Sequence, residues 1–309
     1  MPAALTDRPR LAALLGALCI AFAGIFVRYA DVSPITATFY RCLYALPVLL
    51  LLTVREERAI GPRSRRQALV ALAAGICFGL DLTAFHAAIG AVGAGLATVL
   101  ANLQVVIVGV VAWVALGERP SARLGAAVPL ALAGAVLISG ILGGGAYGEA
   151  PALGVVYGLV AATFYAAYLL ILRSGIGDPR RIAGPILDAT LASAVTAFVL
   201  AAVAGDPDLV PAWPSIVWLV LLALVAQVAG GQLILVSLPR LPAVLTSLIL
   251  LAQPVATVVL AVVLLGEAPT PEQLIGVVLI LSGLVLASGR RRRPRPVAIV
   301  AGPGGGSGG

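Results

Sequence analysis

The chain has 309 residues, of which 61% are hydrophobic and only 11% are charged. Typical soluble domains carry about 45–50% apolar and about 25% charged residues, so this chain has too few polar side chains to cover a surface in water. The composition excludes a soluble globular enzyme, a disordered chain and a coiled coil. It predicts a protein that lies mostly in lipid.

The net charge is +7, and all 20 basic residues are arginines. A nucleic-acid-binding domain gathers its basic residues on one folded face, whereas these arginines are spread between long apolar runs. We therefore expect a lipid bilayer, and not nucleic acid, as a partner. The three cysteines lie within apolar runs and there is one histidine, so no disulfide framework, metal site or cofactor is predicted.

Long apolar runs divide the chain into segments that can each cross a bilayer. A spanning helix needs about 20 apolar residues, and hydrocarbon offers no partners to backbone groups outside a helix. The sequence therefore predicts an all-α polytopic membrane protein with ten transmembrane helices. Their expected ranges are 11–30, 34–54, 67–90, 94–116, 122–141, 152–173, 183–204, 214–237, 243–265 and 272–288.

The arginines predict the orientation of these helices. Ten crossings place both termini on one side, and the loops on that side hold 18 of the 20 arginines, whereas the opposite loops hold none. Because cytoplasmic loops are rich in basic residues, both termini are expected in the cytoplasm. The two remaining arginines, Arg28 and Arg41, lie within spans. Residues 289–309 form a basic cytoplasmic tail with a glycine-rich end.

An internal repeat divides the chain into residues 1–142 and residues 152–288, with five predicted helices each. The fourth and fifth helices resemble the ninth and tenth at a constant offset of 149 residues. Because five is odd, the second copy must enter the membrane in the opposite orientation. Inverted repeats of this kind are the architecture of many secondary transporters. Matching positions include Gln104 with Gln253, Gly117 with Gly266, Glu118 with Glu267 and Pro120 with Pro269.

The two copies resemble the EamA domain of the drug/metabolite transporter superfamily. The first copy reads Ala-Asn-Leu-Gln-Val-Val-Ile at 101–107 and Leu-Gly-Glu-Arg-Pro at 116–120, and the second reads Leu-Ala-Gln-Pro-Val at 251–255 and Leu-Gly-Glu-Ala-Pro at 265–269. Many members have a proline after the glutamine; only the second copy retains it, as Pro254.

The resemblance implies a multi-pass carrier of the inner membrane with cytoplasmic termini, often an exporter of metabolites such as amino acids. We therefore expect a secondary transporter, without ATP, that moves a small amino-acid-like or amphipathic metabolite by alternating access, with protons as a candidate coupling ion. The alternatives are a polytopic membrane enzyme or a non-transporting receptor. An enzyme needs a constellation of acidic, histidine or lysine residues at the membrane edge, and the sequence offers none.

Two charged residues inside spans form the first candidate site. An ionisable group at a helix centre costs about 2.5–3.5 kcal/mol on insertion scales, so each needs a partner or a function. Asp81 lies roughly 13 Å, and Arg41 roughly 10 Å, from the ends of their spans that face away from the cytoplasm. These similar depths predict an ion pair. Two interpretations stay open: the pair only holds two helices together, or Asp81 binds substrate or a proton.

The remaining candidates are one histidine and several amides. His86 can titrate near neutral pH and carry a proton, but a histidine so close to a helix end is also common at a solvated interface. Gln104 and Gln253 occupy equivalent positions in the two copies, so they are expected to line a central cavity. Asn102 joins them as a further uncharged group, with packing between helices as the alternative for all three.

Other residues are expected to have structural roles. Glu118 and Glu267 each follow a helix at the water boundary and are interpreted as turn residues. The glycine pairs Gly75/Gly79 and Gly154/Gly158 predict close helix contacts. A bend is predicted where Gly230 and Gly231 interrupt the eighth helix.

Overall fold

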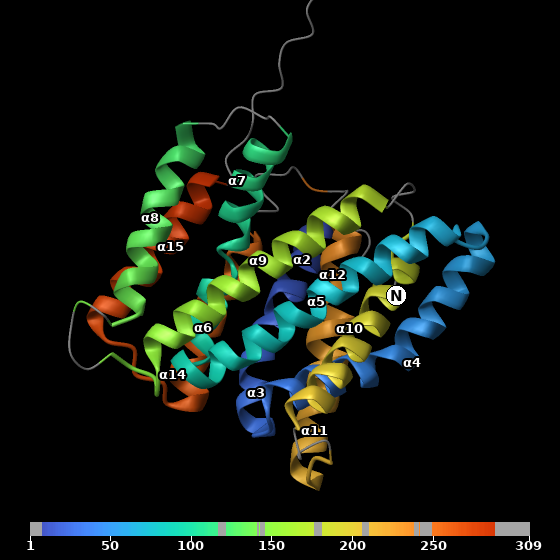
Figure 1. Ribbon diagram of the computed structural model, residues 1–309, viewed down its shortest axis with the longest axis horizontal. Coiled ribbons are helices and arrows are strands. Elements are labelled where there is room, and N and C mark those ends of the chain that lie inside the picture. Colours follow the sequence, from blue (N-terminus) through green and yellow to red (C-terminus); the bar gives the residue numbers. More distant parts are fainter. Residues whose placement is uncertain are drawn as a thin grey trace, which may run out of the picture.

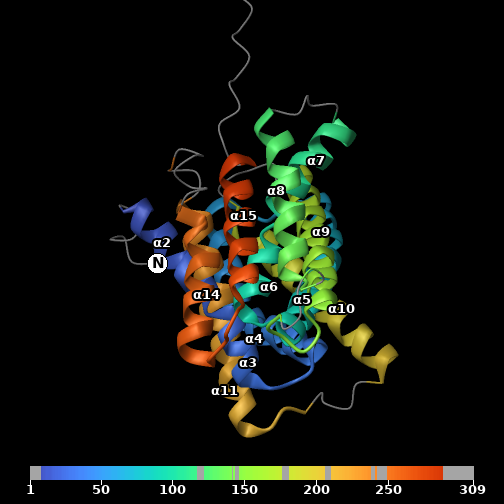
Figure 2. The same ribbon diagram turned by 90° about the vertical axis from the view of Figure 1, so that its left-hand side faces the viewer.

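A computed structural model describes residues 8–116, 122–140, 142, 146–175, 181–205, 210–237, 241 and 249–287. Within these residues all regular structure is helical, which confirms the predicted all-α class (Figures 1 and 2). In chain order the helices are α2 (Pro9–Ala21), α3 (Ala23–Ala30), α4 (Pro34–Ile60), α5 (Arg65–Val92), α6 (Ala94–Ala101), α7 (Gln104–Leu116), α8 (Ala122–Ile138), α9 (Pro151–Gly175), α10 (Ala183–Ala204), α11 (Trp213–Leu221), the π-helix η1 (Leu222–Gly230), α12 (Gly231–Ser237), α14 (Ala252–Leu265) and α15 (Pro271–Ala287).

Several helical segments are long and apolar enough to cross a membrane, so the chain is a multi-pass membrane protein. Each of these segments overlaps a predicted span. The predicted spans 122–141, 243–265 and 272–288 contain shorter apolar helices of 14 to 17 residues. The seven long segments found among the described residues are Pro9–Ala30, Pro34–Ile60, Arg65–Val92, Ala94–Val111, Pro151–Leu172, Ala183–Ala204 and Trp213–Ile234.

Large apolar side chains cover the outside of the helices. Leu69 on α5 is 65% exposed, and Val263 on α14 is 71% exposed. Such exposure costs about 25 cal/mol per Å² in water, whereas a hydrocarbon surrounding imposes no such cost. The surface of the bundle therefore suits the interior of a bilayer.

Helix α4 is longer than predicted because it continues to Ile60 beyond the apolar run that ends near residue 54. The added turns contain Glu56 and Glu57, and charged residues of this type have good helix propensity. Helix α5 then starts with a capping box. Ser64 Oγ accepts from the backbone nitrogen of Gln67, and Gln67 Oε1 accepts from that of Ser64.

Close helix contacts occur at the predicted glycines. A Cβ atom at Gly75 of α5 would lie 2.3 Å from the carbonyl oxygen of Ala189 on α10. A Cβ atom at Gly158 of α9 would lie 2.6 Å from Cβ of Leu100 on α6. Only glycine permits these approaches, which join α5 to α10 and α9 to α6.

Contacts between the two halves of the chain come in matching pairs. In order, α2–α3 corresponds to α9, α4 to α10, α5 to α11–η1–α12, α6–α7 to α14, and α8 to α15. Each of α4, α6 and α8 packs on its own counterpart, and Figure 1 shows α8 beside α15 at one side of the bundle. Helix α5 packs on α9, and the equivalent contact is that of η1 and α12 with α2. Helix α5 also packs on α10, and the equivalent contact is that of η1 with α4. Exchanging the halves leaves this set of contacts unchanged.

The helices that carry the two repeated glutamines are both interrupted just before them. A turn at Asn102 and Leu103 separates α6 from α7, which begins at Gln104. A turn at Leu251 precedes α14, in which Gln253 is the second residue. Asn102 and Leu251 are 149 positions apart, so the break occurs at equivalent positions in both copies.

Candidate functional site

Arg41 on α4 is a buried cation with one hydrogen bond among the described residues. Only 6% of its surface is exposed, and its Nε donates to Oε1 of Gln227 on η1 over 3.0 Å. Gln227 is 9% exposed, and its Nε2 lies 3.4 Å from Oγ1 of Thr190 on α10. A guanidinium does not lose its proton in proteins, so the bond to Gln227 is charge-assisted. It joins residues from different halves of the chain.

The segment that carries Gln227 is a π-helix. It passes into α12 at Gly231, so it ends at the glycine pair where a bend is predicted. π-helical turns are rare and occur frequently at functional sites. The two glycines in the sequence suggest an irregularity here, but they do not reveal a π-helix of nine residues that ends at the first of them.

Asp81 on α5 is also buried, with 5% of its surface exposed. It lies within electrostatic range of Arg41, but no ion pair joins the two within the described residues. The predicted ion pair is therefore not formed, because the amide oxygen of Gln227 is the acceptor that Arg41 contacts. Asp81 makes no hydrogen bond in the described part of the chain. A buried anion and a buried cation thus lie near each other without contact.

Three aromatic rings form a cluster beside these charges. The ring centroids of Phe78 and Tyr168 are 4.7 Å apart, and those of Tyr165 and Tyr168 are 5.6 Å apart. Both tyrosines lie within electrostatic range of Asp81. Cys42, next to Arg41 in sequence, packs into the same cluster. The site therefore combines two opposite charges with an aromatic surface.

His86 is buried, with 2% of its surface exposed, so its interpretation as a solvated interfacial residue is wrong. Its Nδ1 lies 2.9 Å from Oγ1 of Thr38 and 3.4 Å from the carbonyl oxygen of Pro34, both on α4. Its Nε2 is buried and has no hydrogen-bond partner in the described structure. Close helix packing here encloses a residue that hydropathy places near the membrane surface.

The predicted amides lie at the two helix breaks. Asn102 caps α6, and its Nδ2 donates to the carbonyl oxygen of Thr98 over 2.8 Å, which explains it as a local backbone contact. Gln104 is half-buried, and its Oε1 is buried without a hydrogen-bond partner among the described residues. Gln253 is also half-buried. Of these three, Gln104 is the residue with a buried polar atom that lacks a hydrogen-bond partner among the described residues.

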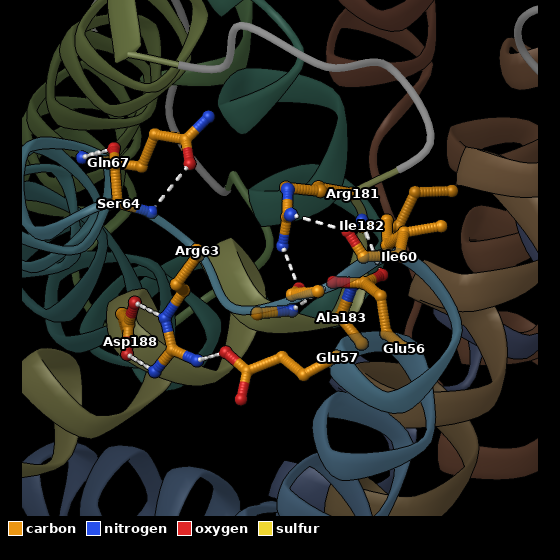
Figure 3. A network of polar contacts seen from close by, with 12 residues as sticks. Glu56, Glu57, Ile60, Arg63, Ser64, Gln67, Arg181, Ile182, Ala183 and Asp188 are labelled. Atoms are coloured by element: carbon orange, nitrogen blue, oxygen red, sulfur yellow. Dashed lines mark hydrogen bonds and ion pairs between the residues drawn. The ribbon is translucent and has the colours of Figure 1, made fainter.

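A network of charged residues joins α4, α5 and α10 at the end of the bundle that carries the loop 61–64 (Figure 3). Arg63 forms a two-point contact with Asp188 of α10, with Nε and Nη2 each 2.8 Å from a carboxylate oxygen. Its Nη1 also contacts Glu57 of α4. The bonds to Asp188 raise the pKa of Arg63 above its ordinary value. We call this end, which holds Arg55, Arg58, Arg63, Arg65 and Arg66, the arginine-rich end.

The same end contains two reciprocal helix caps. Glu56 accepts from the backbone nitrogens of Ile182, Ala183 and Gly184 over 2.7, 2.8 and 3.1 Å, at the start of α10. Arg181 donates in return to the carbonyl oxygens of Ile60 and Gly61, at the end of α4, over 3.0 and 2.9 Å. The backbone groups that a helix leaves unpaired at its ends are thus bonded across the two halves.

At the opposite end of the bundle, Glu267 caps α6. Its carboxylate accepts from the backbone nitrogens of Ala94 and Gly95 over 2.5 and 3.1 Å, and only 3% of its surface is exposed. Burial raises the pKa of Glu267, although the two amides and the charge of Arg28 act against this. The interpretation of Glu267 as a turn residue at the water boundary is therefore incomplete. Glu118, its equivalent, lies outside the described residues.

Cavities lie between the described helices. One of about 440 Å³ lies between the start of α4 and the helices α5, α9 and α10, with Pro34, Thr83, Tyr157 and Leu200 in its wall. A smaller one of about 220 Å³ is lined by Arg28, Tyr147 and Glu149 near the cap of α6. Within the described residues, no group of three His, Cys, Asp or Glu side chains could hold a metal ion.

Sequence reasoning did not single out the residues of the arginine-rich end. Asp188 was detectable as a carboxylate inside the predicted span 183–204, the same signal that identifies Asp81. Glu56 lies just beyond the predicted end of its span, so nothing in the sequence distinguishes it from an ordinary loop residue. Its partners are more than 120 positions away.

Comparisons with known proteins agree with the fold. The model of the EamA-like transporter family matches residues 9–140 and 152–289. A crystal structure described only as that of a protein is 20% identical and covers 91% of this chain and 98% of its own, with a TM-score of 0.62. A search of curated proteins finds no match. The structural likeness concerns the fold alone.

Proposed function

Because the chain belongs to the EamA-like transporter family, we propose that it is a secondary transporter that exports a small amino-acid-like or amphipathic metabolite by alternating access. The two moving units are residues 1–142 and 152–288, as inverted repeats of five helices. The matching contacts between the halves and the equivalent breaks before Gln104 and Gln253 support this division. Two halves of this kind can exchange conformations and open one central site to each side in turn.

The proposed topology has ten crossings with both termini in the cytoplasm of the inner membrane. The arginine distribution supports it, because every loop on one side of a ten-helix arrangement is free of arginine. Residues 289–309 are then a cytoplasmic tail. With an odd number of crossings, loops that contain arginine and loops without arginine would lie on the same side of the membrane.

The observation that carries the proposal is the pair of buried, opposite charges that form no ion pair with each other, at the contact between the halves. Arg41 comes from the first half and is held by Gln227 of the second, and Asp81 lies close by without a hydrogen bond or ion pair among the described residues. Buried charges are costly and mark sites of substrate or ion passage in membrane proteins. Arg41 suits a carboxylate and Asp81 an amino group, while Tyr165 and Tyr168 suit an apolar side chain.

The same arrangement gives a route to proton coupling. A proton and the cationic group of the cargo would compete for Asp81, so that binding of one displaces the other. A proton entering down its gradient would then drive export. His86 is the second candidate for a proton site, because its Nε2 is buried without a hydrogen-bond partner in the described part of the chain.

The test is counterflow into proteoliposomes loaded with members of a panel of amino acids and their amine and carboxylic-acid analogues. We expect uptake of at least one compound that carries both charges, with a pH dependence that disappears in Asp81→Asn while the protein stays folded. Gln232→Leu serves as a matched control, because Gln232 is a half-buried glutamine on α12 with a buried amide nitrogen, and the described structure shows no contact of it with Arg41 or Asp81. Absence of counterflow for the whole panel, or unchanged pH dependence in Asp81→Asn, would contradict the proposal.

A further inference from the structure

Two helix N-termini are capped by a glutamate from the other half of the chain. Neither α10 nor α6 is capped by a side chain of its own N-cap residue. Glu56 at the end of α4 caps α10, and Glu267 after α14 caps α6. A carboxylate at a helix N-terminus pairs the free amides and is attracted by the helix dipole. Each cap therefore bonds one half of the chain to the other.

The caps lie at opposite ends of the bundle. Glu56 is at the arginine-rich end, near Arg63 and the start of α5. Glu267 is beside Gly93, just after the other end of α5. Because α5 crosses the bundle between them, one cap lies near each membrane face. Helices of one half thus meet helices of the other through a carboxylate at both faces.

Each cap is built closely enough that separating the halves would break several bonds together. At the arginine-rich end, the cap is accompanied by the return bonds of Arg181 and by the contact of Arg63 with Asp188. At the other end, Gly93 has φ +91°, and a Cβ atom there would lie 2.8 Å from the carboxyl carbon of Glu267. Neither cap can lengthen by a few ångström and keep its hydrogen bonds.

We propose that these caps are the two locks of the transport pathway: Glu56 holds the arginine-rich end closed, and Glu267 holds the opposite end closed. The inference rests on the proposed alternating access. To admit cargo from one end, the carrier must separate the halves there, which breaks that cap while the other stays bonded. Removing one cap therefore shifts the population toward the conformation that is open at that end only.

A native thiol reports on opening. Cys42 is fully buried beside the aromatic cluster and next to Arg41, so water reaches it only when the centre opens to one side. In a background of Cys19→Ala and Cys77→Ala, Cys42 is the single cysteine. Its rate of reaction with a membrane-impermeant methanethiosulfonate is measured in sealed vesicles of each orientation, so that each face is probed separately.

The variants are Glu56→Ala and Glu267→Ala, each with a matched control at the same end. Arg58→Ala removes an exposed charged side chain from the same turn of α4, and Glu272→Ala removes an exposed carboxylate near Glu267. Glu56→Ala should raise labelling from the arginine-rich face, and Glu267→Ala from the opposite face. Loss of one helix cap predicts an increase of about two- to thirtyfold in rate. The controls should stay near the parent rate.

Three outcomes would overturn the inference: labelling that rises from both faces in one variant, labelling that rises from the wrong face, or no change in either variant. If an alanine variant does not fold, Glu267→Gln, which keeps one acceptor oxygen, and Arg63→Gln provide milder tests with the same expected sides. Counterflow by the parent protein separates this result from the proposed function. If labelling is unchanged but counterflow is intact, the inference about the two caps is refuted, whereas the proposed transport function still stands.

Discussion

The bond between Arg41 and Gln227 allows structure and mechanism to be separated. Gln227→Leu leaves a buried guanidinium without its one hydrogen bond among the described residues. A hydrogen bond to a charged group is worth about 1.5–3 kcal/mol, and an uncompensated buried charge costs about 3–5 kcal/mol, so we expect a loss of at least about 2 kcal/mol. The contact of Gln227 with Thr190 adds little, because 3.4 Å is long for a hydrogen bond.

The double variant Arg41→Met with Gln227→Leu replaces both partners by apolar groups of similar size. Such a replacement is often close to neutral, so the double variant should recover most of the lost stability in a thermal unfolding assay in detergent. Counterflow is then measured on both variants. If Arg41 binds the cargo, the double variant folds but does not transport. A double variant that folds and transports at the parent rate would refute the assignment and leave Arg41 as a packing residue.

Further predictions concern packing, titration and the repeated glutamines. Gly75→Ala should sharply reduce the amount of folded protein, because the added Cβ would lie 2.3 Å from a backbone oxygen. Gly125→Ala, which has open space around it, should be neutral or stabilising by up to about 1 kcal/mol. Expression level and thermal unfolding distinguish the two variants. Burial raises the pKa of Glu267 above its ordinary value of 4.5, so protonation of this carboxyl adds to stability at low pH, and that added stability is lost as pH rises through the raised pKa. The difference in melting temperature between the parent and Glu267→Gln should therefore change across that interval, and a constant difference would contradict it. Gln104→Ala and Gln253→Ala should each reduce counterflow without lowering folded protein, since Gln104 Oε1 makes no bond among the described residues; parent-level transport would assign both to packing.

Apolar runs predict the fold of this protein well because the solvent imposes it. A segment of about 20 apolar residues in lipid must be helical, so the positions of α5, α9 and α10 follow from hydropathy alone. Hydropathy does not predict the end of α4, because Glu56 and Glu57 continue the helix into the polar region. Hydropathy detects where lipid ends, and a helix whose residues have good propensity does not stop there.

The candidate site is predicted less completely because its bonds join distant residues. Hydropathy identifies Arg41 and Asp81 as costly and similar depths suggest a pair, but the partner of Arg41 is 186 positions away on a π-helix. No period of apolar residues encodes a π-helix, and the glycines at its end give only its location. Glu267 and Ala94, 173 positions apart, are likewise brought together by the packing of α14 on α6.

The pair of α4 and α10 shows that the two ends of the bundle are not equivalent. Under the proposed exchange of repeats this pair is its own counterpart, so identical halves would make its two ends equivalent. At the arginine-rich end, Glu56 and Arg181 bond the two helices to each other. At the other end, a cavity of about 440 Å³ is lined by Pro34 at the start of α4 and Leu200 near the end of α10. This difference follows from the sequence, because the position equivalent to Glu56 in the second copy is Gly205 and the position equivalent to Arg181 in the first copy is Val32. Under the proposed alternation, the arginine-rich end must therefore break bonds between α4 and α10 that have no counterpart at the other end.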